Sequence, residues 1–503
     1  MNVQEFTVQI RGVVNEKVQA YFGTVDLQDV VSLDWVQGCA QELAKAVSVC
    51  VFEAWAQVLE RLANEMRPCP QCGRPRKCKR RAGDPIRIDL LGFAFTLPKL
   101  YLECGHCDAP GVSIIKLLTG LQGGDASLEL KLKAAYCASQ HSYKKASRDL
   151  KVHYGQEVER TKVRRLTLEV ERAALEFAER SRVEALGRVS QERRTQGPPV
   201  LMLEADGGKV RTGALTQCEP GDQGYGQRSP KLGRPCRKRP TCFRELITMD
   251  VREPGELEAS ALDVLVPVLA NPGERERRML GLAARKGLGD NTFMQGLGDM
   301  GSELAAAFGE AFVGYPHHWS ADWTHTRDYV DQARAVLRLK DPEAWAEQMR
   351  DAIWDRDERR RDKLLEEARR FRQKKLPSGF EKCPVKALRT YLLNNWAHME
   401  FARLKREGLP FVSARAESQV RDLTKDRFCV PGAWREELLE QKAVLRTIIA
   451  EGRWEVFRRD QILKSKSNFE RALNERLERA QREGRLTVEQ VSSLSGEAQR
   501  AAA

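Results

Sequence analysis

The sequence predicts a multidomain protein that joins helical segments to an α/β domain, a fold of the α + α/β class. The chain has 503 residues, more than one ordinary hydrophobic core organises. Long stretches repeat apolar residues every three or four positions, as amphipathic helices do. Between them, short apolar runs of strand type alternate with helical runs, which is the pattern of an α/β domain.

Residues 1–66 are expected to form a helical N-terminal module. The stretch "WVQGCAQELAKAVSVCVFEAWAQVLERLANEM", residues 35–66, has helical periodicity and contains no Pro. The helix is expected to end at "RPCPQCGRPRKCKRR", where Pro, Gly and Cys take over.

Residues 67–112 predict a zinc ribbon. Two Cys-x-x-Cys pairs flank a hairpin predicted around Gly92, and such pairs supply the tetrahedral thiolate set that Zn²⁺ prefers. The predicted ligands are Cys69, Cys72, Cys104 and Cys107. Four protein ligands leave no open position for water, so this zinc would be structural. Cys78 or His106 could replace one ligand, and four unrelated buried thiols are the weaker alternative.

Residues 113–195 predict a helix-turn-helix region followed by a linker helix. Ser142 is suited to cap a short helix, and a turn around Gly155 would lead to a second helix. That second helix would present Lys162, Arg164 and Arg165 to DNA phosphates and base edges. A helical hairpin with a solvated basic face is the alternative.

Residues 196–330 predict the first part of an α/β core. The run "PPVLMLEADGGKVRTGAL" is typical of a buried strand, a turn and a second strand, and "CFRELITMDV" of a third. A helix is expected near residues 257–269. A loop rich in Gly, Pro and basic residues lies between the strands, and its Lys231, Arg237 and Lys238 are candidates for phosphate contacts.

Residues 331–392 predict a charged helical insertion, and residues 393–503 predict the completion of the core and further C-terminal helices. In the last segment, Arg421 and Lys425 share a broad helix face that could meet a DNA backbone.

Three acids are candidate ligands for divalent cations. Asp206 and Asp299 each follow a predicted strand, and Glu417 lies on a later helix. Oxygen ligands suit Mg²⁺, and two ions held by such acids could activate an in-line phosphoryl displacement. Each acid also has an ordinary interpretation. These are a turn at Asp206, a helix cap at Asp299 and an i,i+4 ion pair between Glu417 and Arg421.

Taken together, the motifs resemble those of DDE transposases from bacterial insertion sequences, nearest the ISKra group. The resemblance rests on Asp206-Gly207, "GLGDMG" around Asp299, "DWTH" at residues 322–325, and "YLLNNWAHMEFARLKREGLPFVSARAES", which contains Glu417. It covers roughly residues 69–454. The sequence departs from the family pattern before the glutamate. Val412 and Ala414 stand where the family has two glycines, and Ala416 stands where it has a valine. The motif around Asp299 reads "DMG" where "DGA" is usual.

The resemblance implies an RNase H-like catalytic core with a helical insertion. It assigns Asp206, Asp299 and Glu417 to a triad that binds Mg²⁺ or Mn²⁺, with Asp322 and His325 supporting the site. It further implies cleavage and strand transfer of double-stranded DNA at transposon ends and target, by a nucleoid-associated homodimer or larger assembly. The basic balance of 84 Lys and Arg against 71 Asp and Glu suits such a polyanionic partner.

Two alternatives stay open. One is a domesticated DNA-binding protein that keeps the fold without catalysis, and the other is a nuclease without strand transfer. The N-terminal residues contain no cationic segment followed by a long apolar run, and no stretch approaches the ~20 apolar residues of a membrane span. We therefore expect a soluble, cytoplasmic protein without a membrane partner.

Overall fold

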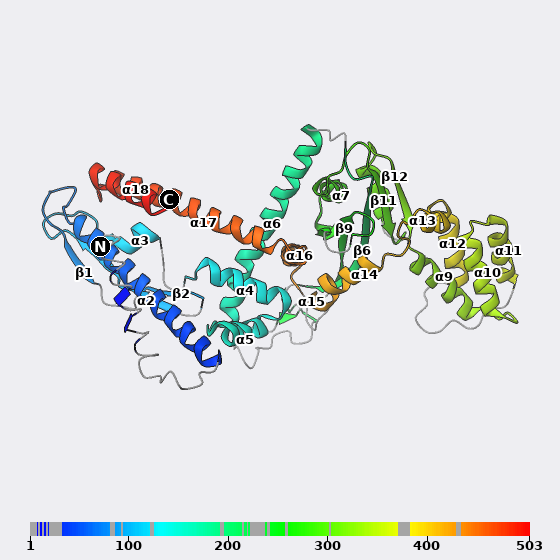
Figure 1. The fold of residues 1–503 in the computed structure, drawn as a ribbon, viewed down its shortest axis with the longest axis horizontal. Coiled ribbons are helices and arrows are strands. Elements are labelled where there is room, and N and C mark those ends of the chain that lie inside the picture. Colours follow the sequence, from blue (N-terminus) through cyan, green and yellow to red (C-terminus); the bar gives the residue numbers. More distant parts are fainter. Residues whose placement is uncertain are drawn as a thin grey trace. The chain divides into compact units, whose positions relative to one another are not determined.

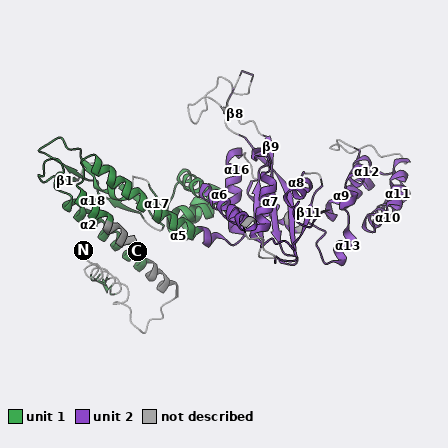
Figure 2. Cartoon of the chain, turned by 90° about the horizontal axis from the view of Figure 1, so that it is seen from above, with its two compact units in different colours: residues 1–170, 458–503 green, residues 171–457 purple. Residues whose placement is uncertain are grey.

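The computed structural model has a mixed α/β fold, which confirms the predicted class at this level (Figure 1). Its contacts divide the chain into two compact units, residues 1–170 with 458–503 as unit 1, and residues 171–457 as unit 2 (Figure 2). The structure describes a few positions among the first 32 residues and then residues 33–502, except for 81–85, 92–93, 121–124, 192–195, 214–215, 219, 222–236, 239–241, 257–259, 301–302, 371–382 and 429–433.

Unit 1 begins with the predicted long helix and the predicted ribbon. A three-stranded antiparallel sheet has the order β1-β4-β5, and a separate hairpin pairs β2 with β3. The elements are α2 (Leu33–Glu65), β1 (Lys77–Arg80), β2 (Ile86–Asp89), β3 (Ala94–Leu97), β4 (Leu100–Glu103), β5 (Val112–Ser113) and α3 (Ile114–Thr119). The helix and the hairpin agree with the sequence prediction.

The C-terminal helices complete the core of unit 1. Apolar side chains of α17 (Trp454–Arg482), of α18 (Val488–Ala502) and of the turn between them pack with those of α2 and the ribbon. The buried residues from this C-terminal part are Leu473, Leu477, Ala480, Leu486 and Leu494. Residues 458–503 are grouped with the N-terminal residues by their contacts, not with the preceding core segment to which the sequence prediction assigns them.

A small helical core follows the ribbon within unit 1. It is formed by α4 (Leu128–Gln140), α5 (Tyr143–Tyr154) and the start of α6 (Arg160–Gln191). The Ser142 hydroxyl accepts a hydrogen bond of 3.3 Å from the backbone NH of Lys145, as expected of a helix cap. Gly155 ends α5 with a φ of 64°, a left-handed conformation that glycine adopts without strain. The predicted cap, turn and second helix are therefore present.

Unit 2 contains a five-stranded sheet in the order β10-β9-β6-β11-β12. In this sheet β11 runs parallel to β6 and to β12, whereas β9 is antiparallel to β6 and to β10. The strands are β6 (Val200–Thr212), β9 (Cys242–Arg252), β10 (Ala261–Leu265), β11 (Phe293–Gly298) and β12 (His317–Ala321). A short separate ladder pairs β7 (Thr216–Gln217) with β8 (Arg237–Lys238).

Two predictions for this region were wrong. The Asp-Gly-Gly sequence at residue 206 is not a turn, because β6 continues through it and pairs with β9 as far as Thr212. The run near residues 257–269 is not a helix where it is described. It forms β10 and the short 3₁₀ turn η1 (Pro267–Leu269), because a brief apolar run fits a buried strand as well as a helix.

The two faces of the sheet carry different side chains, because successive residues of a strand point to opposite faces. One face packs Leu201, Leu203 and Ala205 of β6 into an apolar core with α7 (Glu274–Arg285) and α8 (Leu304–Ala311). The alternate residues of β6, including Glu204, Asp206 and Gly208, point to the other face. There the sheet meets α14 (Ala414–Gln419) and the π-helical segment η3 (Val420–Lys425).

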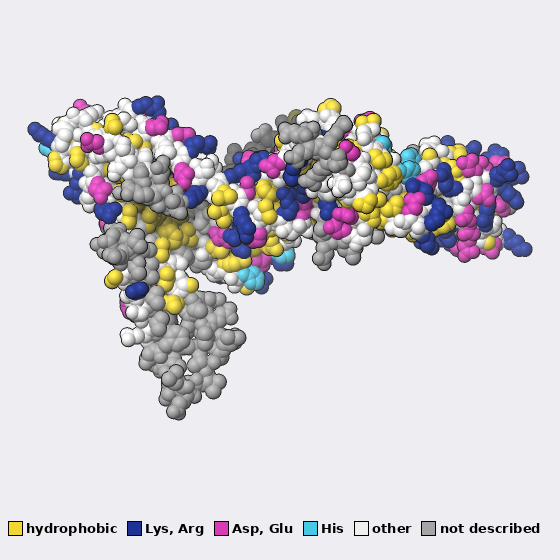
Figure 3. All heavy atoms as spheres, turned by 45° about the horizontal axis from the view of Figure 1, so that its top comes forward, with side chains coloured by type: hydrophobic (Ala, Val, Ile, Leu, Met, Phe, Trp, Pro, Cys, Tyr) yellow, Lys and Arg dark blue, Asp and Glu magenta, His cyan; other side chains and the backbone are white. Residues whose placement is uncertain are grey.

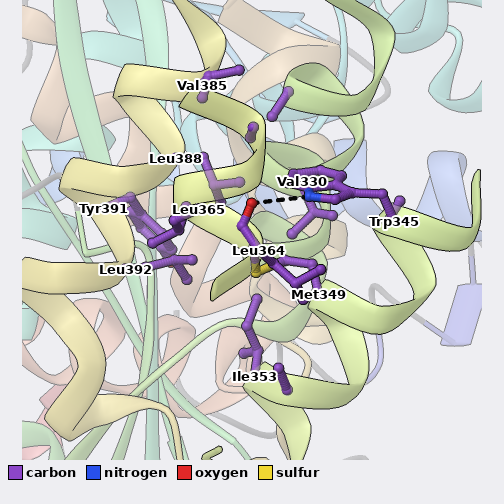
Figure 4. Packing of buried hydrophobic residues seen from close by; sticks show 14 of the residues in the cluster. Val330, Trp345, Met349, Ile353, Leu364, Leu365, Val385, Leu388, Tyr391 and Leu392 are labelled. Atoms are coloured by element: carbon purple, nitrogen blue, oxygen red, sulfur yellow. Dashed lines mark hydrogen bonds between the residues drawn. The ribbon is translucent and has the colours of Figure 1, made fainter. Parts of the chain in front are cut away.

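Helices separate β12 from α14, as the sequence predicted. Four of them share a core that Figure 4 shows from close by, in which the Trp345 indole NH donates a hydrogen bond of 3.1 Å to the carbonyl oxygen of Leu364. These helices are α9 (Trp323–Val336), α10 (Pro342–Trp354), α11 (Glu358–Arg370) and α12 (Pro384–Asn395), followed by η2 (Trp396–His398) and α13 (Phe401–Arg406).

Unit 2 closes with α15 (Asp426–Phe428) and α16 (Glu436–Ala450). On the visible face of the molecule, Lys and Arg side chains are interspersed with Asp and Glu (Figure 3). Among the helices that the structure describes, none has both the length and the apolar character that a membrane crossing requires.

Candidate functional site

The four predicted zinc ligands come together at one end of the β1/β4 pair. Cys69 and Cys72 precede β1, and Cys104 and Cys107 follow β4. Because Lys77 at the start of β1 pairs with Glu103 at the end of β4, both Cys-x-x-Cys turns lie at the same end. All four sulfur atoms lie within 4.8 Å of one another. This group can hold a metal ion such as zinc.

The pKa values of these thiols reflect their close packing. Burial raises the pKa of Cys69, but hydrogen bonds from the backbone NH groups of Cys72 and Gln71 and from neighbouring thiols outweigh it and lower the pKa to about 7. The backbone NH of Ala109 lowers the pKa of Cys107, but desolvation and the neighbouring thiols outweigh it and raise the pKa to about 12. Closely packed thiolates repel one another, and a bound cation would remove that repulsion.

Three aspartates occupy matching positions on neighbouring parallel strands. Ala205 of β6 pairs in register with Gly298 of β11, which pairs with Ala321 of β12. The next residues along each strand direction are Asp206, Asp299 and Asp322. The strands β11 and β12 end at this point, so their aspartates lie at the carboxyl edge of the sheet, where α/β folds commonly place their ligand sites.

The carboxyl group of Asp206 lies among charged neighbours. Its Oδ1 accepts a hydrogen bond of 2.7 Å from the backbone NH of Gly207. Burial raises the pKa of Asp206, and the negative charge of Asp299 raises it further, whereas the Gly207 NH and the charges of His325 and Lys425 act against this rise. Asp206, Asp299 and His325 are therefore close enough to interact electrostatically.

Asp322 connects the end of β12 to the segment that precedes Glu417. Its Oδ1 accepts a hydrogen bond of 2.9 Å from the backbone NH of His325 and so caps α9. Its Oδ2 accepts a hydrogen bond from the backbone NH of Ser413, and the Trp323 NH donates to the carbonyl oxygen of Phe411 at 2.9 Å. The buried Asp322 carboxylate therefore fixes the start of α14 beside the edge of the sheet.

Glu417 projects from α14 toward His325. The Glu417 Oε1 lies 4.0 Å from the His325 Nε2, and about half of the Glu417 side chain is exposed. His325 links this carboxylate electrostatically to Asp206. Among the described residues, however, the four cysteines are the group whose ligand atoms all lie within 4.8 Å, and the carboxylates of Asp206, Asp299 and Glu417 do not form such a group.

The ordinary interpretations of the three acids do not fit the structure. Asp206 lies within a continuous strand, not in a turn. The helix after Asp299 has Glu303 at its N-cap position, four residues further on, so Asp299 is not the capping residue. The ion pairs of the described residues join Arg421 to Asp422, at 3.5 Å, and do not include a pair between Arg421 and Glu417.

A close approach between β6 and η3 holds the Glu417 helix over the sheet. A β-carbon at Gly208 would lie 2.8 Å from the Thr424 Cγ2 and 3.2 Å from the Val420 Cγ1, so only glycine leaves enough space. Behind η3, the buried Arg446 of α16 donates hydrogen bonds to the carbonyl oxygens of Leu423 and Asp422. π-Helical turns occur frequently at functional sites.

The basic residues predicted to contact DNA have different surroundings. Arg164 and Arg165 are exposed on α6, and Arg421 and Lys425 are exposed on η3. Lys162 forms an ion pair with Asp89 of β2, so its role in unit 1 is at least partly structural. Of the loop residues, Lys231 lies outside the described residues, and Arg237 and Lys238 form β8.

The residues that hold α14 against the sheet are absent from the sequence predictions. Asp250 of β9 is fully buried and accepts hydrogen bonds from Arg415 and Gln419, one on each side of Glu417. A signal was present, because Thr248, Asp250 and Arg252 alternate with apolar residues in a strand whose two faces are both buried. No protein-family model matches this chain, and a comparison with curated proteins finds no match.

Proposed function

We propose that this protein is a DNA transposase of the DDE type, with the sheet of unit 2 as an RNase H-like catalytic core. It would bind transposon ends and catalyse metal-dependent cleavage and strand transfer. One observation carries the proposal: Asp206 and Asp299 follow register-paired residues on adjacent parallel strands, and His325 connects Asp206 to Glu417. Asp206, Asp299 and Glu417 are also the three acids that the sequence resemblance assigns to the metal-binding triad.

The chemistry follows from carboxylate oxygens at the edge of a sheet. Asp206, Asp299 and Glu417 would be the protein ligands of Mg²⁺ or Mn²⁺, ions that prefer oxygen ligands and retain waters and substrate phosphates. Two such ions stabilise the attacking and leaving oxygens of an in-line phosphoryl displacement. The Glu417 side chain is about half exposed, and a rotation toward the two aspartates would have to close the remaining distance when the ions bind.

The raised pKa of Asp206 is consistent with a cation site. A buried carboxylate next to a second carboxylate is costly in its charged form, and a bound divalent ion would compensate both charges. Asp322 and His325 would support the site, Asp322 by fixing the start of α14 and His325 by contacting Glu417.

DNA binding is proposed for unit 1 and for the surface of η3. The second helix of the helix-turn-helix region exposes Arg164 and Arg165, and η3 exposes Arg421 and Lys425. The formal charge of +13 favours association with a polyanion. Because two transposon ends must be joined in one event, the active form is proposed to be a homodimer or a larger DNA-bound assembly.

The decisive experiment measures cleavage of DNA fragments that carry the sequences flanking the coding region. The purified full chain is incubated with Mg²⁺ or Mn²⁺, and the wild type is compared with the Asp206→Asn and Glu417→Gln variants. A matched control is Asp290→Asn, because Asp290 is an exposed acid before β11. We expect cleavage by the wild type and the control, and a loss of at least 100-fold in the other two.

Equal cleavage by all four proteins would rule out the proposed triad. Binding of the fragments without any cleavage by the wild type would favour the non-catalytic DNA-binding protein instead. Cleavage without joining to a second DNA would favour a nuclease.

A further inference from the structure

The buried carboxylate of Asp250 is a meeting point between β9 and the helix that carries Glu417. The Asp250 Oδ2 accepts hydrogen bonds from the Arg252 Nη1 at 3.1 Å, the Arg415 Nε at 3.0 Å and the Gln419 Nε2 at 2.9 Å. Arg415 is held a second time, because its Nη2 donates to the Ser260 Oγ at 2.7 Å. One carboxylate oxygen thus joins two side chains of α14 to the sheet.

The charges of this buried cluster balance. Arg252 also pairs with Glu204 on β6, so the carboxylates of Glu204 and Asp250 face the guanidinium groups of Arg252 and Arg415. A buried charge is costly unless it is paired and hydrogen-bonded. The Asp250 Oδ1 has no hydrogen-bond partner among the described residues. The three hydrogen bonds to Oδ2 are therefore the main interactions that offset the cost of burying this carboxylate.

The helical geometry explains what the cluster does to Glu417. Arg415 and Gln419 are four residues apart, so they project from the same face of α14, toward Asp250 of β9. Glu417 lies between them and projects away from β9, toward His325, because two residues correspond to about 200° of rotation. Hydrogen bonds from both flanking side chains to one fixed acceptor therefore set the rotation of α14 about its axis.

Apolar packing alone would not fix this rotation as strictly. Val420 and Leu423 bury the following turn, but contacts between apolar groups have little directional preference. Hydrogen bonds weaken steeply when their angles deviate, and those to charged groups are the strongest. At the other end of α14, the bond from the Ser413 NH to Asp322 fixes the start of the helix.

We infer that Asp250 is a positioning residue for Glu417, acting through Arg415 and Gln419 to direct the Glu417 carboxylate toward the two aspartates. This inference rests on the proposed function, because it assigns Glu417 a cation to bind. Asp250 is fully buried, so in this proposal it acts through α14 and not as a cation ligand or a DNA contact. Its loss should therefore weaken cation binding by misdirecting Glu417, while the fold of the sheet is retained.

The test measures Mn²⁺ affinity directly, from the electron paramagnetic resonance signal of free Mn²⁺ during a titration. The full chain is first saturated with zinc, so that the cysteine group is filled. The main variant is Arg415→Lys, which keeps the charge but loses the planar fork of donors. Gln419→Leu and Asp250→Asn are the second and third variants, and urea unfolding of each protein reports its stability.

The matched control is Arg435→Lys, because Arg435 is exposed and its ion pair with Glu437, at 3.8 Å, is loose. We expect the Arg415→Lys and Gln419→Leu proteins to bind Mn²⁺ about tenfold more weakly than the wild type, with unfolding midpoints close to that of the control. Glu417→Gln serves as the reference for complete loss of this ligand. A merely structural role would change the unfolding midpoint and leave the Mn²⁺ affinity unchanged.

Two outcomes separate the inference from the function on which it rests. If Glu417→Gln weakens Mn²⁺ binding but Arg415→Lys and Gln419→Leu bind like the control, the inference is wrong and the proposed cation site stands. If the wild type and Glu417→Gln bind Mn²⁺ equally, the proposed cation site is wrong and the inference is overturned with it.

Discussion

Asp322 accepts a hydrogen bond from the backbone NH of Ser413, four residues before Glu417, although 91 positions of sequence separate the two. The same carboxylate caps α9 through the NH of His325. A single buried side chain therefore closes the long helical insertion at its base and determines where the Glu417 helix begins.

Replacing Asp322 should remove both functions at once. We expect Asp322→Ala to lower the free energy of unfolding by about 2 kcal/mol, because a helix cap is lost and the buried Ser413 NH loses its partner. Cation-dependent cleavage should be lost as well. The measurements are urea unfolding and the cleavage assay.

A second helix cap provides the control for this variant. Asp341 caps α10 by accepting a hydrogen bond of 3.0 Å from the Ala344 NH, at an exposed position. Asp341→Ala should cost about 1 kcal/mol and leave cleavage unchanged. Equal activity in both variants would show that Asp322 has no role beyond capping.

Gly208 should not tolerate even one methyl group. We expect Gly208→Ala to destabilise the protein by about 1–3 kcal/mol, because the new β-carbon would overlap Thr424 and Val420 and displace η3. Thermal unfolding measures the effect. At Gly187 in α6 a β-carbon meets nothing within 4 Å, so Gly187→Ala should stabilise the protein by up to about 1 kcal/mol. If both substitutions have the same effect, β6 and η3 are not in close contact.

The ionisation of Asp206 should reduce stability as the pH rises. Its pKa is raised by burial in the folded protein, so the folded state binds this proton more tightly than the unfolded state. The stability contribution is therefore fully present below the ordinary pKa of an aspartate, about 4, and is lost as the pH rises through the raised value. At neutral pH and without added Mg²⁺, Asp206→Asn should be more stable than the wild type by about 0.5–1 kcal/mol.

Urea unfolding between about pH 4 and pH 7 checks this expectation, because the advantage of Asp206→Asn should grow across that range. Added Mn²⁺ should then stabilise the wild type more than the variant. An advantage that is independent of pH would exclude ionisation as its cause.

The zinc content should be about one atom per chain, held by the four cysteines. Cys72→Ser should lose the zinc and expose the ribbon to proteolysis, because the metal contributes to folding. Cys78→Ser and His106→Ala should keep it, since neither residue belongs to the four-cysteine group. Metal analysis and limited proteolysis measure both effects. A variant of Cys72 with its full zinc content would assign the metal elsewhere.

Local patterns were sufficient for much of the fold. Helical periodicity predicted α2, the Ser142 cap predicted the start of α5, and the spacing of the cysteine pairs predicted the ribbon. In each of these cases the determining interactions lie within a short stretch of sequence, where propensity and capping act.

Long-range pairing explains the errors. The glycines after Asp206 favour a turn, but ladder pairing with β9 over the length of β6 outweighs that preference. β10 pairs with β9, and this long-range pairing decides between strand and helix for its short apolar run. The role of Asp250 was equally hidden, because its partner Arg415 lies 165 residues away and only the folded chain brings them together.

The core of unit 1 has a consequence for how the protein is made. Leu477 and Leu494 occupy the same apolar core as Leu59 and Leu97, so this core depends on residues that are translated much later than α2 and the ribbon. Until α17 and α18 have been translated, this core lacks their apolar side chains, and the apolar surface that they would cover is exposed to water. Exposed apolar surface of this kind favours aggregation, so we expect the nascent chain to be most vulnerable before α17 and α18 have been synthesised.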